Sequence, residues 1–339
     1  MRLLYLSCHS VLEYDEILLF RELGIEVFSH GAYSDPERQG DGMRKPIEGL
    51  KADPKILEIF RRTPKENLTE EMVEPFDTVI VMSVAPWISR NWPVLKKKRV
   101  IWRCIGQNHS HDELSLKSFR AEGLQIVRCS PKESTIPGYI GADAFIRFYK
   151  DPSLFRGWTG EEAFAVNFTQ SMKQRARECN FAFFKRVMEG MPCRLYGPHN
   201  DSIGKEWARG ALPLEEFLVQ LQKNRVYFYT GTYPASYTLN FIEAWMTGIP
   251  VLALGPQYGN DPQLLGYDLY EVPDLIRHGT DGFFSDDETE CRQILRDLFR
   301  DRDYARAVGA KGRESAIKLF GKDRIKKQWA DFLLDPASS

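Results

Sequence analysis

Four polar residues recur at helical spacing between Val226 and Leu254, and their chemistry suits a nucleotide. Steps of four, three and four residues separate Ser236, Asn240, Glu243 and Thr247. Residues at this spacing share one face of a helix. The carboxylate of Glu243 could then accept hydrogen bonds from the hydroxyls of a ribose. An ordinary amphipathic helix with one solvated glutamate fits the same spacing, so periodicity alone leaves both interpretations open.

The flanking segments predict a strand–helix–strand unit that would position these residues. Val226–Tyr229 is a short run of β-branched and aromatic residues, which is typical of a buried strand. The following helix is predicted to end at Gly248, because Pro250 cannot continue it, and Val251–Leu254 forms the next strand. Two strands joined in this way run parallel. The polar face would therefore begin just past the carboxyl end of a strand, where α/β sheets bind phosphates and nucleotides.

The same alternation of strands and helices begins in each half of the chain and predicts an α/β fold. Arg2–Ser7 reads as a strand, Val11–Leu23 as a helix and Ile25–Ser29 as a second strand, which is the opening of a doubly wound domain. Ala163–Phe168 starts the alternation again. A chain of 339 residues has room for two such domains.

Two segments resemble glycosyltransferase family 4, a family with the GT-B fold. Glu243–Val251 (EAWMTGIPV) resembles the donor-site helix of that family, and Pro273–Phe283 (PDLIRHGTDGF) resembles a second of its conserved segments. The two occur in the order that the family shows. Two matching segments in the right order are more specific than either segment alone.

This resemblance implies two Rossmann-like doubly wound domains that face each other across a cleft, with a C-terminal helix that crosses back to the first domain. Residues 1–150 would form the acceptor domain and residues 151–322 the nucleotide-sugar donor domain. Residues 323–339 would supply the returning helix.

The resemblance also implies a donor site in the second domain. The family uses an arginine and a lysine to neutralise the leaving nucleoside diphosphate. Lys173 matches the lysine by its spacing from the preceding strand, whereas Phe168 stands at the arginine position, so Arg175 would substitute for the arginine. Both cations stand before a helix predicted around Glu178–Met188. The family's first glutamate is replaced here by Ala235, and nearby hydroxyls would partly substitute for it. The complete set of donor-binding candidates is Lys173, Arg175, Gly197, Ser236, Tyr237, Thr238, Leu239 and Glu243.

A polar loop after the strand predicted at Val100–Ile105 supplies further catalytic candidates. The resembled family commonly has a histidine or similar polar group at this strand end, facing the donor sugar. Gln107 is nearest to that place and His109 lies two residues later. Together with Lys173 and Arg175 these are the catalytic candidates. His109 and His111 have metal-like spacing, but a third ligand is not evident, so no metal site is predicted.

The resemblance implies transfer of a sugar from a nucleotide-sugar donor, most simply a UDP-sugar, to an acceptor hydroxyl. The family retains the anomeric configuration and needs neither a metal nor another cofactor. Two alternatives are a non-catalytic nucleotide- or glycan-binding protein on the same fold, and another enzyme acting on a nucleotide-sugar, such as an epimerase.

The acceptor is not predicted by the sequence and could be a small molecule, a glycan, a protein or DNA. Acceptor-side candidates are His9, Ser10 and Trp87, although a loop histidine is often only solvated and a tryptophan often packs in a core. A DNA-modifying glycosyltransferase acting on a hydroxylated base would find phosphate contacts in the basic run Lys96–Arg99. The same run also fits a solvated entry to a strand.

Composition sets broad limits on compartment and partners. The formal net charge is −1, which neither favours nor excludes an anionic partner. Six cysteines are scattered without metal-ligand spacing, which favours reduced thiols in a cytoplasmic protein. No long apolar run exists, so no membrane span is expected. The oligomeric state is not predicted.

Overall fold

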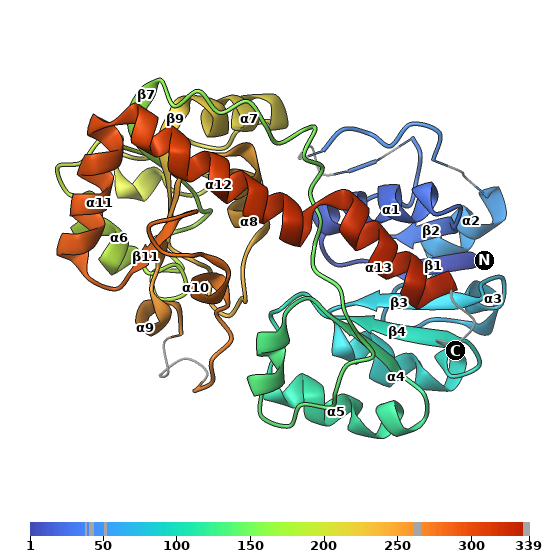
Figure 1. The fold of residues 1–339 in the computed structure, drawn as a ribbon. Helices are drawn as coiled ribbons and strands as arrows, with labels where there is room; N and C mark the ends of the chain where they lie inside the picture. Colours follow the sequence, from blue (N-terminus) through green and yellow to red (C-terminus); the bar gives the residue numbers. More distant parts are fainter. Residues whose placement is uncertain (38, 41–43, 51–52, 261–265, 335–339) are drawn as a thin grey trace. The chain divides into compact units, whose positions relative to one another are not determined.

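The computed structural model describes residues 1–37, 39–40, 44–50, 53–260 and 266–334 of the chain. It separates into two compact units, each built on its own parallel sheet (Figure 1). The first unit comprises Met1–Phe148 together with the chain from Ile325 onward, and the second unit comprises Tyr149–Arg324. The predicted α/β fold class is confirmed, including a C-terminal helix that returns to the first unit. The last five residues of the predicted C-terminal segment, 335–339, lie outside the described residues.

The first unit has a six-stranded parallel sheet in the order β2-β1-β3-β4-β5-β6. Its strands are β1 (Arg2–Leu6), β2 (Glu26–His30), β3 (Thr78–Met82), β4 (Arg99–Arg103), β5 (Gln125–Arg128) and β6 (Ala144–Phe145). The chain moves from β1 to β2 in one direction and from β3 to β6 in the other. The strand order therefore reverses between β1 and β3, which is the arrangement of a doubly wound domain.

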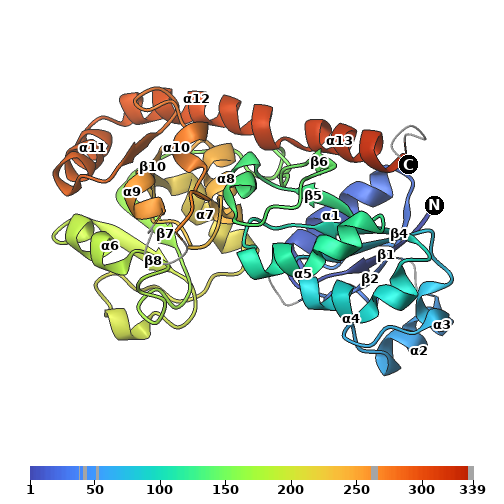
Figure 2. The same cartoon turned by 90° about the horizontal axis from the view of Figure 1, so that it is seen from below.

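Helices cover both faces of this sheet. They are α1 (Ser10–Glu22), α2 (Pro54–Arg62), α3 (Glu70–Val73), α4 (Ala85–Leu95), α5 (Ser110–Ala121) and α13 (Lys322–Leu334), with a short 3₁₀ helix at Pro131–Thr135. Because crossovers between parallel strands are right-handed, the reversal of strand order puts α1 on one face and α4 and α5 on the other. Figure 2 shows α13 and the α4–α5 pair on opposite sides of the sheet.

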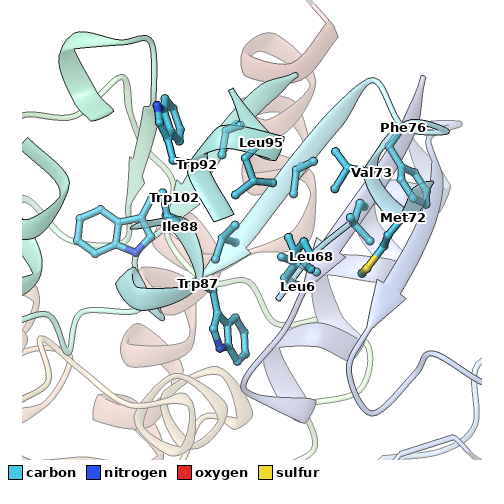
Figure 3. Packing of buried hydrophobic residues seen from close by; sticks show 14 of the residues in the cluster. Leu6, Leu68, Met72, Val73, Phe76, Trp87, Ile88, Trp92, Leu95 and Trp102 are labelled. Carbon is cyan, nitrogen blue, oxygen red and sulfur yellow. The ribbon is translucent and has the colours of Figure 1, made fainter. Parts of the chain in front are cut away.

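The core on the α4 face is built from alternate strand residues and one side of that helix. Leu6 of β1 and Trp102 of β4 belong to the same buried cluster as Trp87, Ile88 and Trp92 of α4 (Figure 3). The indole Nε1 of Trp92 donates to Glu122 Oε2 at 2.7 Å, which satisfies its polar atom within the unit. Trp92 is thus a packing residue. The helix over Ala85–Leu95 was not predicted, because Pro86 and Pro93 obscure its pattern.

The opposite face is closed by α1 and α13. The ring of Phe20 packs edge-on against Tyr5 at 6.0 Å and against Trp329 at 5.1 Å. Arg99 donates through its guanidinium to the carbonyls of Phe332 at 2.8 Å and Leu333 at 3.1 Å. These carbonyls belong to the last turn of α13 and have no partner within the helix, so Arg99 caps the helix that returns from the second unit.

The second unit has a five-stranded parallel sheet in the order β11-β10-β9-β7-β8. Its strands are β7 (Glu162–Phe168), β8 (Cys193–Tyr196), β9 (Asn224–Tyr229), β10 (Val251–Leu254) and β11 (Phe283–Ser285). The chain passes from β7 outward to β8, then returns to β9 and proceeds to β10 and β11. The order therefore reverses between β7 and β9.

The helices of this unit pack in two groups, α6 with α11, and α7 and α12 with α8. Their bounds are α6 (Phe181–Met188), α7 (Leu214–Lys223), α8 (Leu239–Thr247), α9 (Pro256–Gly259), α10 (Val272–Leu275), α11 (Glu288–Arg300) and α12 (Arg302–Phe320), with a short 3₁₀ helix at Asp201–Ile203. The predicted unit β9–α8–β10 is present, and Gly248 ends α8 in the left-handed conformation, φ 91°.

Two predicted helix starts were wrong. α8 begins at Leu239, with Thr238 as its N-cap, so Ser236 precedes the helix instead of opening its polar face. α6 begins at Phe181, because residues 170–180 form a run of turns. Turn-forming hydroxyls stand at several consecutive positions before α8, and sequence spacing does not distinguish which of them caps it.

We predict that Trp329→Ala destabilises the first unit by about 3–5 kcal/mol, because it removes a fully buried ring that joins α13 to α1. Leu334→Ala is the matched control, since Leu334 is on the same helix but 46% exposed. Chemical denaturation of both variants measures the difference. Equal midpoints would show that α13 does not contribute to the stability of the first unit.

Candidate active site

The reversal of strand order in the second unit defines the first candidate site. Parallel strands direct the loops that follow them to one edge of the sheet, and ligands of open α/β sheets bind where the order reverses. Here the two loops concerned follow β7 and β9, and they cover residues 169–180 and 230–238. They carry five of the predicted donor residues, Lys173, Arg175, Ser236, Tyr237 and Thr238.

Two asparagines and a threonine join the ends of β7 and β9. Asn167 Nδ2 donates to Phe228 O at 2.8 Å and to Thr230 Oγ1 at 3.2 Å, while Asn180 Nδ2 donates to Thr230 O at 3.2 Å. Asn167 is 1% exposed, and its Oδ1 has no hydrogen-bond partner in the described part of the chain. A buried acceptor without a hydrogen bond lowers the stability of the folded state, and such acceptors are often found where a ligand or a water molecule binds. Sequence reasoning missed these residues, because isolated asparagines are frequent at strand ends.

A third loop, after β8, lies against the loop after β7. Asn200 is buried and donates to Thr169 O at 2.7 Å, while its Oδ1 accepts from Met172 N at 2.9 Å. Gly197 has φ 131°, and a Cβ on it would lie 2.7 Å from Thr169 O. The predicted donor residue Gly197 therefore has a steric reason to be glycine: its missing side chain lets the two loops approach each other.

Backbone strain is concentrated after the carboxyl ends of strands. Among the described residues, those other than glycine with positive φ are Ser83, Ser171, Asn180 and His199. Ser83 follows β3, Ser171 and Asn180 follow β7, and His199 follows β8. Such conformations are disfavoured for L-residues and are enriched at functional sites.

The two predicted cations lie in the loop after β7. Lys173 is exposed, and its Nζ donates to Ser202 O at 3.3 Å. Arg175 is half-buried, and its backbone N–H donates to Ser171 O at 2.9 Å. The expectation that both precede the helix directly was wrong, because α6 starts only at Phe181. A contact to a ligand would come from the loop rather than from the first turn of the helix.

The loop before α8 holds the remaining donor candidates. Ser236 is 1% exposed, and its Oγ has no hydrogen-bond partner among the described residues, while its carbonyl accepts from Glu271 N at 2.9 Å. Tyr237 is buried, with its ring 5.3 Å from that of Phe320. Thr238 and Leu239 are half-buried at the start of α8.

Glu243 lies in the interior of the second unit, not on an open helix face. Its Oε1 is 2.7 Å from the Nζ of Lys150, and the two side chains are 3% and 1% exposed. Thr247 Oγ1 donates to Glu243 O at 2.8 Å, and Asn240 Nδ2 donates to Phe168 O at 2.6 Å. The polar residues of α8 thus form internal hydrogen bonds, so the alternative of a solvated glutamate was wrong. A ribose would reach this carboxylate only if the residues that cover it moved.

The first unit presents the other catalytic candidates in the loop after β4. Gln107 is exposed, and His109 is the N-cap of α5, with its backbone N–H donating to Asp112 Oδ2 at 2.9 Å. Its ring stacks on that of His111 at 6.0 Å. Among the described residues, no group of three or more histidines, cysteines or acids is arranged to hold a metal ion.

A buried ionic network supports this loop. Arg128 pairs with Glu113 at 2.5 Å and with Glu133 at 3.6 Å, and all three side chains are fully buried. Asn108, next to Gln107, donates to Glu133 Oε2 at 3.3 Å. Burial raises the pKa of Glu133 although Arg128 opposes the shift. The network fixes the backbone between the two catalytic candidates.

The acceptor-side candidates lie where the strand order of the first unit reverses. His9 caps α1, with its Nδ1 accepting from Leu12 N at 3.4 Å, and Ser10 is the first residue of that helix. Trp87 is 9% exposed, and its Nε1 donates to Glu66 Oε1 at 3.1 Å. Lys65, which the sequence did not single out, lies with its Nζ 4.9 Å from the centre of the Trp87 ring and donates to Ser7 O at 2.6 Å.

The basic run Lys96–Arg99 does not lie at this edge. Its three lysines precede β4 and Arg99 is the first residue of that strand, so the run occupies the edge of the sheet where strands begin. Lys97 pairs with Glu70 at 2.5 Å, Lys98 donates to Glu74 O at 2.7 Å, and Arg99 caps α13. The run therefore lies away from His9, Ser10 and Trp87, and its interpretation as a nucleic-acid contact stays a prediction.

Comparisons with known proteins identify the fold. The structure is similar to sucrose-phosphate synthase from Thermosynechococcus elongatus, with TM-score 0.66 and 13% identity over 97% of each chain. It is also similar to HepE from Anabaena in complex with UDP and glucose, with TM-score 0.63 and 11% identity over 99% of this chain and 100% of that one. An alpha-glucosyltransferase in complex with UDP-glucose and DNA containing an abasic site is similar with TM-score 0.65 and 11% identity over 99% of this chain and 100% of that one.

These similar structures are GT-B glycosyltransferases, so the chain has the GT-B fold. No family model matches the sequence, and no curated protein matches it. In the part of the chain that the structure describes, no helix is long and apolar enough to cross a membrane.

We predict that Gly197→Ala destabilises the second unit by about 1–3 kcal/mol more than Gly204→Ala, because only the first places a methyl group against backbone. Gly204 is the matched control: its φ is also positive, 105°, but a Cβ there would meet nothing within 4 Å. Thermal and chemical denaturation compare the two. Equal losses would show that backbone conformation, not the approach of the two loops, requires glycine at position 197.

Proposed function

We propose that this protein is a glycosyltransferase that moves a sugar from a nucleotide-sugar to an acceptor hydroxyl, and that the donor is UDP-linked, as in its structural neighbours. The observation that carries this proposal is the placement of the α8 segment. The family-4-like residues of α8 follow β9, at the reversal point of a doubly wound sheet, in a chain with the GT-B fold. HepE binds UDP and glucose on a similar fold, and the alpha-glucosyltransferase binds UDP-glucose.

The donor would be held by the loops after β7 and β9. The diphosphate would accept hydrogen bonds from backbone N–H groups at the start of α8 and charge-assisted bonds from Lys173 and Arg175. The unpartnered Oγ of Ser236 would find a partner in the same ligand. Glu243 would accept from the ribose hydroxyls after the residues that cover it move.

The chemistry that fits these residues is displacement of the nucleoside diphosphate without a metal ion. The bond between the anomeric carbon and the diphosphate oxygen breaks, and the electron pair leaves with the diphosphate. Lys173 and Arg175 would stabilise this charge. The acceptor oxygen attacks the same face of the sugar, and its proton passes to the leaving phosphate, so the configuration is retained without a protein nucleophile. Gln107 and His109 would act on the sugar side.

The acceptor would be bound by the first unit, near His9, Ser10 and Trp87. The structure offers no ground for preferring DNA, since Lys96–Arg99 lies at the other edge of the sheet. A non-catalytic nucleotide-binding protein would share the donor site and differ only in turnover, so transfer or hydrolysis of a bound nucleotide-sugar separates the two.

A thermal-shift panel of nucleoside diphosphates and nucleotide-sugars, run with EDTA, tests the donor site. We expect a shift with uridine nucleotides, because a ligand at a hundredfold excess over its Kd stabilises the folded state by about 2.7 kcal/mol. A shift that disappears with EDTA would contradict metal-independent binding. No shift with any nucleotide would contradict the proposed function.

We predict that Lys173→Ala and Arg175→Ala each lower kcat by roughly a hundredfold, because each removes a cation that stabilises the leaving diphosphate. Lys185→Ala is the matched control: Lys185 is exposed on α6 and belongs to no proposed contact. Steady-state kinetics at saturating donor measure the effect. If all three variants turn over equally fast, the cations of this loop do not serve the reaction.

A further inference from the structure

Lys150 and Glu243 form an ion pair that the second unit encloses almost completely. Lys150 Nζ lies 2.7 Å from Glu243 Oε1, with side-chain exposures of 1% and 3%. The lysine follows directly on the start of the second unit at Tyr149, and the glutamate lies in α8. Sequence spacing does not indicate this pair, because Lys150 and Glu243 lie far apart in the chain.

The backbone fixes the position of the lysine independently of its charge. Lys150 N donates to Phe320 O at 3.0 Å, and Lys150 forms a parallel bridge with Gly321. Its ammonium also lies 5.8 Å from the centre of the Phe155 ring. The lysine is therefore anchored by its main chain, and the side chain is presented to Glu243 from a fixed point.

Stability alone gives little reason for such a pair. The desolvation of two buried ions offsets most of their attraction, and two apolar residues of similar size are often as stable. Loss of one partner is different, because it leaves the other charge buried without compensation. A buried carboxylate without its cation takes up a proton near neutral pH.

Three further charged or titratable groups of the described residues near the pair have partners of their own or a raised pKa. Asp151 pairs with Lys322 at 3.2 Å, and Arg313 on α12 donates to Pro152 O at 2.8 Å. Tyr227 on β9 faces Glu243, and its burial, with the nearby Tyr229 and Glu243 charges, raises the pKa of the phenol well above its usual value. Lys150 is thus the counterion of Glu243 in this structure.

We propose that Lys150 is a positioning residue of the donor site: it holds the Glu243 carboxylate ionised and in a fixed orientation for the ribose hydroxyls of the donor. This inference rests on the proposed function. Hydroxyls bind a carboxylate more strongly than a neutral carboxyl group, because the acceptor is charged. The lysine thereby sets donor affinity without touching the donor itself.

The test compares UDP with 2′,3′-dideoxy-UDP as ligands of wild type, Lys150→Met, Lys150→Arg, Glu243→Gln and the double variant Lys150→Met/Glu243→Gln. Calorimetry from about pH 7 to about pH 9 gives Kd at each pH, across a range in which an uncompensated buried carboxyl titrates. Denaturation of each variant reports stability separately. Lys150→Gln replaces Lys150→Met if the latter does not fold.

We expect Lys150→Met to weaken UDP binding roughly tenfold or more at about pH 7 and to recover part of the loss as pH rises and Glu243 ionises. Lys150→Arg keeps the cation and should show no such pH dependence. In the Glu243→Gln background the Lys150→Met change should alter neither Kd nor its pH profile. Wild type should prefer UDP to the dideoxy nucleotide, and Lys150→Met should lose most of that preference.

Lowered stability of Lys150→Met with an unchanged Kd and pH profile would overturn the inference, because the pair would then only hold the fold together. The proposed function would survive that result, since UDP would still bind wild type. Failure of wild type to bind UDP would overturn both the UDP donor site and this role of Lys150.

Discussion

Every candidate residue in this chain depends on one constraint, which is that parallel strands send the loops that follow them to the same edge of a sheet. Both units obey it, with sheets whose strand order reverses once, between β1 and β3 and between β7 and β9. Short polar side chains then hold neighbouring loops together. Asn167 and Asn180 join the ends of β7 and β9, and Asn200 joins the loops after β7 and β8. These ties satisfy many polar atoms of the loops. Asn167 Oδ1 and Ser236 Oγ are among the buried atoms of the described residues that keep no hydrogen-bond partner, and they therefore point to a ligand.

Buried charge is the second feature that organises both units. Arg103 pairs with Glu16, Arg128 with Glu113 and Glu133, and Lys150 with Glu243, all with side chains at most 4% exposed. None of these pairs is required for a stable core, because desolvation consumes most of their attraction. Each pair instead fixes the orientation of the side chains that form it and of those bonded to them. The Arg128 network holds Asn108 beside Gln107, and Lys150 holds the one carboxylate on α8. Rigid placement of polar groups is what a transferase without a metal ion would need, since its stabilising charges must be in position before the bond breaks.

The elements with strong local signals could be predicted from the sequence. The apolar run of β9, the left-handed Gly248 and the position of Pro250 defined the β9–α8–β10 unit, and β10 was predicted with its observed bounds. Prolines inside α4 hid a helix of eleven residues, and the start of α8 was misplaced because several hydroxyl residues could cap it. The environment of Glu243 could not be predicted. Helical spacing correctly placed Glu243 on one face of α8 with Asn240 and Thr247. The burial of that face involves Lys150, which comes from a distant segment, and no local sequence pattern predicts such a contact.

Ala235 stands where the family that the sequence resembles has its first glutamate, and this difference bears on how the sugar would be recognised. Ala235 is 4% exposed, so the position is packed and not open for a sugar hydroxyl. Ser236 beside it keeps an unpartnered Oγ, and its carbonyl binds the backbone of Glu271, itself a buried acid at the start of α10. The main chain of an acidic residue is thus bonded beside the altered position, and it comes from the segment after β10 instead of the loop after β9. If the donor sugar meets a carboxylate in this protein, Glu271 is a candidate, because its main chain is bonded to Ser236, the neighbour of Ala235. Exchange of Glu271 for glutamine would then change the choice of sugar, while binding of the bare nucleoside diphosphate would stay as it is.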